Sequence, residues 1–139
     1  MVEWSDSYLV GVEALDIEHK DLINRLNQLH NKFYRRQGDK SRMEDYLKEI
    51  HDRIHAHFSM EEDMMRDSDY PDFTQHKKEH DNFLGVIDNL IKKYQNSPDY
   101  SFSEVLEDIL SEWIGNHIAA SDHKLGIHLI RDQREKGQR

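Results

Sequence analysis

The sequence predicts an all-α protein, folded as an up-down-up-down antiparallel four-helix bundle with an extended N-terminal arm. Two observations support this prediction. The 139 residues contain four long stretches in which apolar side chains recur at helical spacing, and short breaks separate these stretches. The composition, 36% hydrophobic and 34% charged, suits helices that each bury a narrow stripe and expose a wide solvated face. Because this length fits one domain, we expect residues 1–139 to form a single domain.

The predicted helices are bounded by breaks that contain glycine or proline. We expect them over residues 16–37, 41–66, 73–95 and 102–122 or beyond. Gly38 follows the first helix as a stop signal, and Pro71 and Pro98 lie in the breaks after the second and third helices. Since these connections are only a few residues long, neighbouring helices run antiparallel. We expect residues 1–15 to form the extended arm and residues 131–139 to be frayed.

The composition also excludes several classes of protein. Nineteen Lys and Arg against 28 Asp and Glu give a net charge of −9, which argues against nucleic acid or an anionic membrane as the main partner. No cysteine is present, so disulfide scaffolds, thiolate zinc sites and iron–sulfur clusters are excluded. The N-terminus lacks the features of a signal peptide, and no apolar run approaches the roughly 18 residues of a membrane span. We therefore expect a cytoplasmic protein without membrane insertion, with a monomer as the favoured state.

Histidines interrupt the apolar stripe of the third predicted helix. This stripe alternates steps of three and four residues: Phe73, His76, His80, Phe83, Ile87, Leu90 and Tyr94. The spacing is that of a heptad seam, and it places His76 and His80 on the same inward face, about one turn apart. The second predicted helix has a corresponding pair, His57 and Glu61, on its own seam.

The first and fourth predicted helices each add one histidine, His19 and His117, to their apolar stripes. A single histidine on such a stripe is usually an ordinary core or boundary residue. Five imidazoles and a carboxylate without strong partners, however, would cost on the order of several kcal/mol for each group. A domain has only about 5–15 kcal/mol of net stability, so the pattern predicts that these side chains converge on a bound cation.

The other five histidines serve as an internal control. His51 and His55 also lie four residues apart, but each is one position off the seam, so we expect both at the boundary or the surface. His30 follows a seam leucine and is interpreted in the same way. We expect no metal role for His123 and His128. A chelating pair formed by His51 and His55 on the surface is the weaker alternative.

The donor set indicates the kind of metal. Imidazole and carboxylate ligands without thiolate suit iron, manganese or zinc, and five histidines exceed the number that one catalytic zinc needs. Carboxylates can bridge two cations, and Glu61 is one candidate bridge. Asp122 is another, but it follows His117 by five residues, which an α-helix turns through about 140°. Regular helix geometry therefore does not place Asp122 on the same face as His117.

In order and spacing, these residues resemble the ligand motifs of the hemerythrin family. The matching positions are His19, His57 with Glu61, His76 with His80, and His117 with Asp122. The bacterial branch, the bacteriohemerythrins, is the most similar. The resemblance extends from about Trp4 to Asp122, whereas the segment from His123 to His128 departs from the family pattern.

The resemblance implies a cofactor of two non-haem iron ions. One iron would be bound by His76, His80 and His117, and the other by His19 and His57. Glu61 and Asp122 would bridge the two ions together with an oxo or hydroxo group, which leaves one open position on the second iron. The pocket around that position would be lined by apolar side chains, namely Leu22, Phe58, Trp113 and Ile118.

The function implied by the resemblance is reversible dioxygen binding for oxygen carriage, storage or delivery, without catalysis. The partners would be dioxygen and an oxygen-consuming enzyme or electron donor. Three alternatives stay open: a module that senses oxygen or redox state, a di-iron oxidase and an iron-storage protein. The oxidase is disfavoured, because ferritin-like members of that class carry paired Glu-x-x-His motifs and this sequence contains none.

Overall fold

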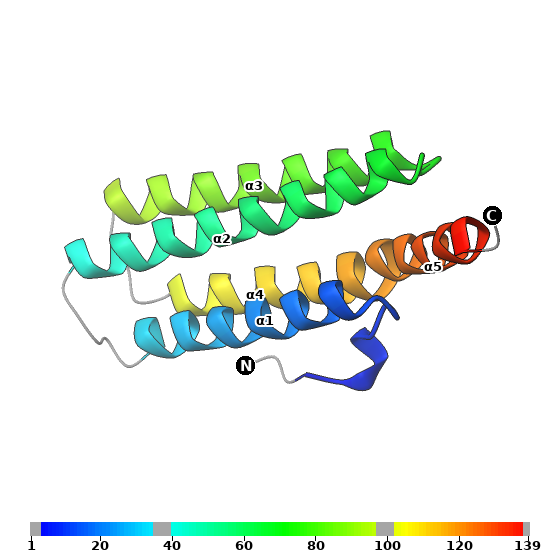
Figure 1. The fold of residues 1–139 in the computed structure, drawn as a ribbon. Helices are drawn as coiled ribbons and strands as arrows, with labels where there is room; N and C mark the ends of the chain where they lie inside the picture. The colour runs from blue at the N-terminus through cyan, green and yellow to red at the C-terminus, as the bar shows by residue number, and fades with distance from the viewer. Residues whose placement is uncertain (1–3, 35–39, 97–101, 138–139) are drawn as a thin grey trace.

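The structure is a computed structural model that describes residues 4–34, 40–96 and 102–137. Within these ranges the chain is all-helical and contains no strand, as the sequence predicts. The long helices run antiparallel along one bundle axis, with α2 and α3 forming one pair and α1 and α4 the other (Figure 1). Their bounds are α1 (Glu13–Tyr34), α2 (Lys40–Asp67), α3 (Phe73–Asn96) and α4 (Phe102–Trp113). The fourth segment continues through the π-helix η2 (Ile114–Asp122) into α5 (His123–Gly137).

The N-terminal arm is shorter and less extended than predicted. A 3₁₀-helix, η1, covers Asp6–Tyr8, and α1 begins at Glu13, three residues before the predicted start. The chain turns at Gly11, whose φ of 86° lies in the left-handed region that favours glycine. The Val10 N–H then donates a hydrogen bond of 2.8 Å to the Asp16 carboxylate, which fastens the turn to the first turns of α1.

The predicted fraying of residues 131–139 is wrong for residues 131–137, which continue α5. This helix is ordered by its contacts with the rest of the bundle. Leu125 and Leu129 are buried, and His128 Nε2 donates a hydrogen bond of 2.9 Å to the main-chain oxygen of Ser68. Residues 138–139, and residues 35–37 at the predicted end of the first helix, lie outside the described ranges.

A buried polar layer divides the apolar core into two clusters. The smaller cluster is formed by Val10, Leu15, Met65, Tyr70, Leu125 and Leu129. The larger cluster fills the rest of the bundle and includes Leu22 and Phe58. Along α1, His19 lies between Leu15 of the smaller cluster and Leu22 of the larger one. The polar layer is therefore enclosed by apolar side chains on both sides.

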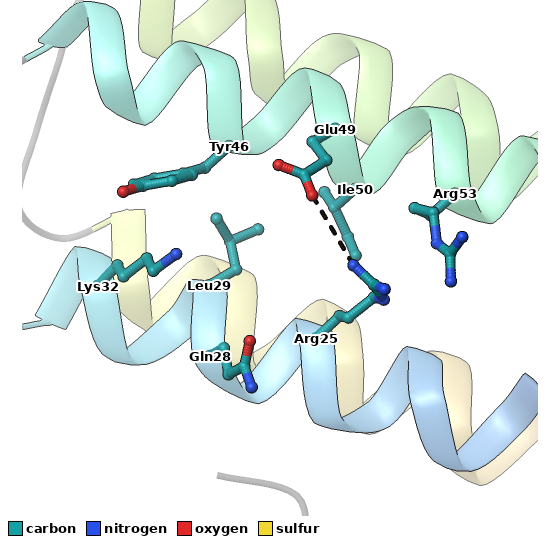
Figure 2. Close-up of a pocket in the computed structure, with 8 residues that line it drawn as sticks. All are labelled: Arg25, Gln28, Leu29, Lys32, Tyr46, Glu49, Ile50 and Arg53. Atoms are coloured by element: carbon teal, nitrogen blue, oxygen red, sulfur yellow. Dashed lines mark ion pairs between the residues drawn. The ribbon is translucent and has the colours of Figure 1, made fainter.

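At the surface, α1 and α2 are joined by exposed and half-buried charged side chains around a pocket (Figure 2). Arg25 lies 3.8 Å from Glu49, and Lys32 Nζ lies 3.8 Å from the ring centroid of Tyr46. Exposed ion pairs of this kind contribute only about 0–1 kcal/mol each, so the apolar core supplies most of the stability of this helix pair.

None of the helices in the described ranges is long and apolar enough to cross a lipid bilayer.

Candidate metal centre

Seven buried side chains from four helical segments meet in the polar layer. They are His19 from α1, His57 and Glu61 from α2, His76 and His80 from α3, and His117 and Asp122 from η2. Each of the seven residues is at most 6% exposed. The structure thus brings together every residue of the ligand set that the sequence predicts.

The donor atoms form two groups that share both carboxylates. In the three-histidine group, atoms of His76, His80 and His117 lie within 4.8 Å of one another and of Glu61 and Asp122. In the two-histidine group, atoms of His19 and His57 lie within 4.8 Å of one another and of the same two carboxylates. Two cations could therefore occupy adjacent positions with Glu61 and Asp122 between them.

Glu61 presents one oxygen to each group. Its Oε1 lies 3.1 Å from His76 Nε2 and 3.2 Å from His80 Nε2. Its Oε2 lies 3.3 Å from His19 Nε2 and 2.5 Å from His57 Nε2. The two oxygens of this carboxylate are thus divided between the histidine groups, which is the arrangement of a bridging ligand.

Asp122 is divided in the same way. Its Oδ1 lies 2.9 Å from His76 Nε2 and 3.0 Å from His117 Nε2, both in the three-histidine group. Its Oδ2 lies 2.9 Å from His19 Nε2 in the two-histidine group. Both carboxylates therefore have the geometry to connect two cations.

The π-helix η2 explains how Asp122 reaches the layer. A π-helix closes each turn with a hydrogen bond between residues five apart, whereas an α-helix uses residues four apart. His117 and Asp122 are separated by five residues, so one turn of η2 places them on the same face. Regular α-helical geometry would have placed Asp122 about 140° from His117, and the departure from that geometry in η2 is what brings the two side chains together. The five-residue spacing between two polar side chains was the available signal of the wider turn.

Opposite charges inside the layer shift several pKa values. Burial by itself lowers the pKa of His19, but the carboxylates of Asp122 and Glu61, 2.9 Å and 3.3 Å from its Nε2, outweigh burial and raise the pKa to about 9. The same balance raises the pKa of His76 to about 9 and, with the charge of Asp122, that of His117 to about 10. A metal ion at these nitrogens would have to compete with protons.

The carboxylates shift in the opposite direction. Burial and the nearby charge of Glu61 favour protonation of Asp122, but His117 and His19 outweigh them and lower its pKa to about 2. Burial likewise opposes ionisation of Glu61, yet four surrounding imidazoles hold its pKa well below the ordinary value. Both carboxylates are thus kept ionised, as metal ligands must be.

Unpartnered polar atoms show that the layer fits a cation. Among the described residues, several buried atoms make no hydrogen bond of good geometry, although each lies 2.5–3.2 Å from an atom of opposite charge: Nε2 of His57, His80 and His117 and both carboxylate oxygens of Asp122. Each such atom costs about 1–3 kcal/mol when nothing replaces its contacts with water. Because all of them are nitrogen or oxygen donors grouped around common points, iron, manganese or zinc would satisfy them together.

Two carboxylates behind the histidine rings were not predicted from the sequence. Glu62 accepts a hydrogen bond of 3.0 Å from His80 Nδ1, and Glu79 accepts one of 3.1 Å from His117 Nδ1. The bond that Glu79 accepts from His117 outweighs its partial burial and lowers its pKa to about 2. Both residues adjoin a candidate ligand in the sequence, and this adjacency was the signal that could have indicated them.

The four apolar residues predicted to line a ligand pocket are all buried in the larger cluster: Leu22, Phe58, Trp113 and Ile118. The ring of Phe58 stacks on that of His80 with centroids 3.9 Å apart, and Trp113 stacks on His117 at 6.1 Å. These two rings therefore flank the three-histidine group. Leu22 follows His19 by three residues in α1, beside the two-histidine group. The role of the four residues in a ligand pocket stays a prediction.

The control histidines lie outside both groups. His55 is exposed and His51, a quarter exposed, pairs with Asp88 at 3.0 Å, as their positions off the seam predict. His30 is more buried than predicted, at 9% exposure, and lies 3.5 Å from Glu107. His123 and His128 hydrogen-bond to main-chain oxygens.

Comparison with known families identifies the domain. A family model described as the Hemerythrin HHE cation binding domain matches residues 10–126. The chain belongs to the hemerythrin family. Its fold and its buried cluster of histidine, glutamate and aspartate are thus those of a hemerythrin-family cation-binding domain.

Individual hemerythrins match this chain over most of its length. The bacteriohemerythrin of Clostridium acetobutylicum is 31% identical over 129 residues, which cover 89% of this chain and 98% of the relative. The bacteriohemerythrin of Stenotrophomonas maltophilia is 29% identical, covering 97% of this chain and 88% of the relative. The myohemerythrin of Theromyzon tessulatum is 30% identical, with 88% of each chain covered.

Solved hemerythrin structures share the fold. A wild-type hemerythrin crystal structure matches with a TM-score of 0.77 at 28% identity, covering 93% of this chain and 98% of the other. A variant of hemerythrin with a leucine replaced by tyrosine gives a TM-score of 0.81 at 28% identity, covering 93% and 97%. The resemblance inferred from the ligand motifs is therefore confirmed at the level of family and fold.

Proposed function

We propose that this hemerythrin-family chain holds two iron ions in its polar layer and binds dioxygen reversibly there, for oxygen carriage, storage or delivery. The observation that supports the proposal most directly is the division of both shared carboxylates between two histidine groups. His76, His80 and His117 would hold one ion, and His19 and His57 the other. Glu61 and Asp122 would bridge them.

The unequal numbers of histidines would leave room for a small ligand. Three nitrogens and two carboxylate oxygens surround one position, whereas two nitrogens and two oxygens surround the other. When bound, the iron pair supplies the electrons that reversible dioxygen binding requires. The apolar side chains of Leu22, Phe58 and Ile118 keep water and protons away from the layer, which favours binding over turnover.

Exposure of the reduced protein to air tests this function. Iron-loaded protein, reduced without oxygen, is expected to contain two iron ions per chain and to develop a visible absorption band in air that disappears under vacuum, over repeated cycles. A content of one iron per chain would contradict the two-ion centre. Irreversible bleaching with turnover of hydrogen peroxide would support an oxidase instead, and uptake of many iron ions per chain would support storage.

A further inference from the structure

The two histidine groups differ in what lies behind their rings. In the three-histidine group, the outer nitrogens of His80 and His117 donate hydrogen bonds to the carboxylates of Glu62 and Glu79, at 3.0 Å and 3.1 Å. In the two-histidine group, Nδ1 of His19 and Nδ1 of His57 are buried and have no hydrogen-bond partner among the described residues. Among the residues that the structure describes, outer carboxylates therefore support the three-histidine group and not the two-histidine group.

This difference changes how well each group can bind a cation. A histidine that binds metal through Nε2 keeps its proton on Nδ1, and a carboxylate that accepts this proton fixes the tautomer and the orientation of the ring. The carboxylate also makes Nε2 a better donor and adds a negative charge near the cation. A buried Nδ1–H without an acceptor lacks these advantages. It also lacks the hydrogen bond that water would accept from it if the ring were exposed.

Both outer carboxylates are held in place by further contacts. Glu79, on α3, connects this helix to the π-helix through its bond with His117, and it lies in the same pocket as Ser121, the residue before Asp122. The side chain of Glu62 is only 12% exposed, and Lys77 Nζ lies 3.7 Å from its carboxylate. The stacking of Phe58 on His80 restrains the same imidazole ring. Neither carboxylate has to be ordered when a metal ion enters.

We propose that Glu62 and Glu79 are positioning residues that make the three-histidine group the stronger of the two metal sites. The three-histidine group then binds the first metal ion and releases it last, and the two-histidine group, where a small ligand would bind, is the more easily emptied. This inference rests on the two-metal centre of the proposed function. It does not depend on whether that centre binds dioxygen.

Titration of metal-free protein with Co²⁺, followed by visible absorption, tests the order of binding. Two steps of one Co²⁺ per chain are expected, the first removed by His80→Ala and the second by His57→Ala. Glu79→Gln is expected to weaken the first step by about 10- to 100-fold and to leave the second unchanged. Glu62→Gln is expected to do the same, so the proposal can be tested if either variant fails to fold, as judged by circular dichroism.

Glu112→Gln is the matched control. Glu112 lines the same surface pocket as Glu79 and His117, and its substitution removes one negative charge without removing an acceptor from a histidine ring. We expect both Co²⁺ steps to be unchanged in this variant. Equal weakening of both steps by Glu79→Gln, no effect of either glutamate variant, or the same loss in Glu112→Gln would overturn the proposal.

The same titration separates this inference from the proposed function. A single Co²⁺ per chain would contradict both, because the centre would then hold one ion. Two steps with the expected selectivity, in a protein whose iron form does not bind dioxygen reversibly, would support the asymmetry of the sites and contradict the oxygen-binding function.

Discussion

For a single histidine, the position on the helix decides whether it joins the candidate centre. His51 and His55 have the same four-residue spacing as His76 and His80, yet the first pair lies at the boundary and surface and the second pair is buried in the layer. One residue turns an α-helix by about 100°, so a shift of one position moves a side chain from the core face toward solvent. Residue type alone does not distinguish the two pairs.

This difference predicts the effect of single alanine substitutions. His57→Ala and His76→Ala are each expected to reduce iron bound per chain, because each removes a donor from the layer. His51→Ala and His55→Ala are expected to retain the iron content and absorption spectrum of the parent. Metal analysis and absorption spectra of the four purified variants make the comparison. Loss of the iron absorption band in His51→Ala would contradict the claim that position on the apolar seam decides which histidines bind iron.

Leu22 is expected to protect the iron pair from oxidation. Leu22→Ala would open a cavity beside the two-histidine group, with a stability cost of about 2–5 kcal/mol for a fully buried leucine. Because a larger pocket admits water and protons, we expect the variant to keep two iron ions per chain but to autoxidise faster than the parent. The decay of the oxygenated absorption band in air measures this rate.

Leu47→Ala is the control for the loss of packing. Leu47 is equally buried in α2 but lies ten residues before His57, roughly 15 Å along the helix. It should lower stability by a similar amount without changing the autoxidation rate. Unchanged autoxidation in folded, iron-loaded Leu22→Ala protein would contradict the pocket assignment of this residue.

Among the elements, the fourth helical segment departs most from regular geometry. The π-helical stretch η2 sets His117 and Asp122 on one face, and the Glu79 carboxylate accepts a hydrogen bond from His117 of this stretch. The following helix, α5, packs against the N-terminal segment so closely that a Cβ atom at Gly126 would overlap the main-chain carbonyl of Val10. A side chain at this position would therefore push α5 away from the bundle.

The close approach at Gly126 predicts opposite effects of the same substitution in two helices. Gly126→Ala is expected to lower the free energy of unfolding by about 1–3 kcal/mol, because the methyl group overpacks the contact with Val10. Gly85→Ala, in α3, meets nothing within 4 Å and is expected to raise the free energy of unfolding by about 0.5–1 kcal/mol through helix propensity. Denaturant unfolding of the two variants measures both values. A Gly126→Ala variant as stable as the parent would contradict the packing of α5.

For the whole molecule, the charges of the polar layer make the stability of the metal-free protein depend on pH. The pKa values of His19, His76 and His117 are raised from 6.5 to about 9 or 10, so their contribution is complete below pH 6.5 and is lost as the pH rises through 9. The pKa of Asp122 is lowered from 3.8 to about 2, so its contribution is lost as the pH falls through that range. Maximal stability is therefore expected between about pH 4 and pH 6.5.

The urea midpoint of metal-free protein, measured at about pH 3, 5.5 and 9, checks this expectation. The midpoint should be highest at the middle pH. Saturation with Zn²⁺, which binds neutral imidazole, should remove the decrease on the alkaline side, because metal then replaces the lost protons. A midpoint of metal-free protein that increases from the middle to the high pH would contradict this account of the layer.

The four-helix fold and the convergence of the seam histidines could both be predicted from the order of residues along the chain. Both follow from periodicity along the chain, because a 3.6-residue repeat decides which side chains share a face. The same repeat correctly places His57 and Glu61 in the layer and His55 outside it. The order and spacing of these ligands also sufficed for the resemblance to the hemerythrin family.

Features that depend on contacts between distant segments became visible in the folded protein alone. The wider turn that brings Asp122 onto the face of His117 is not encoded by α-helical periodicity. Glu79 and His117 are 38 residues apart in the chain, and His128 and Ser68 are 60 apart, so neither hydrogen bond can be inferred from local pattern. Those contacts place the carboxylates behind the histidine rings and stabilise α5 as a helix. Most of the free energy that stabilises a helix in a protein comes from packing against other helices and not from the helix propensity of its own segment.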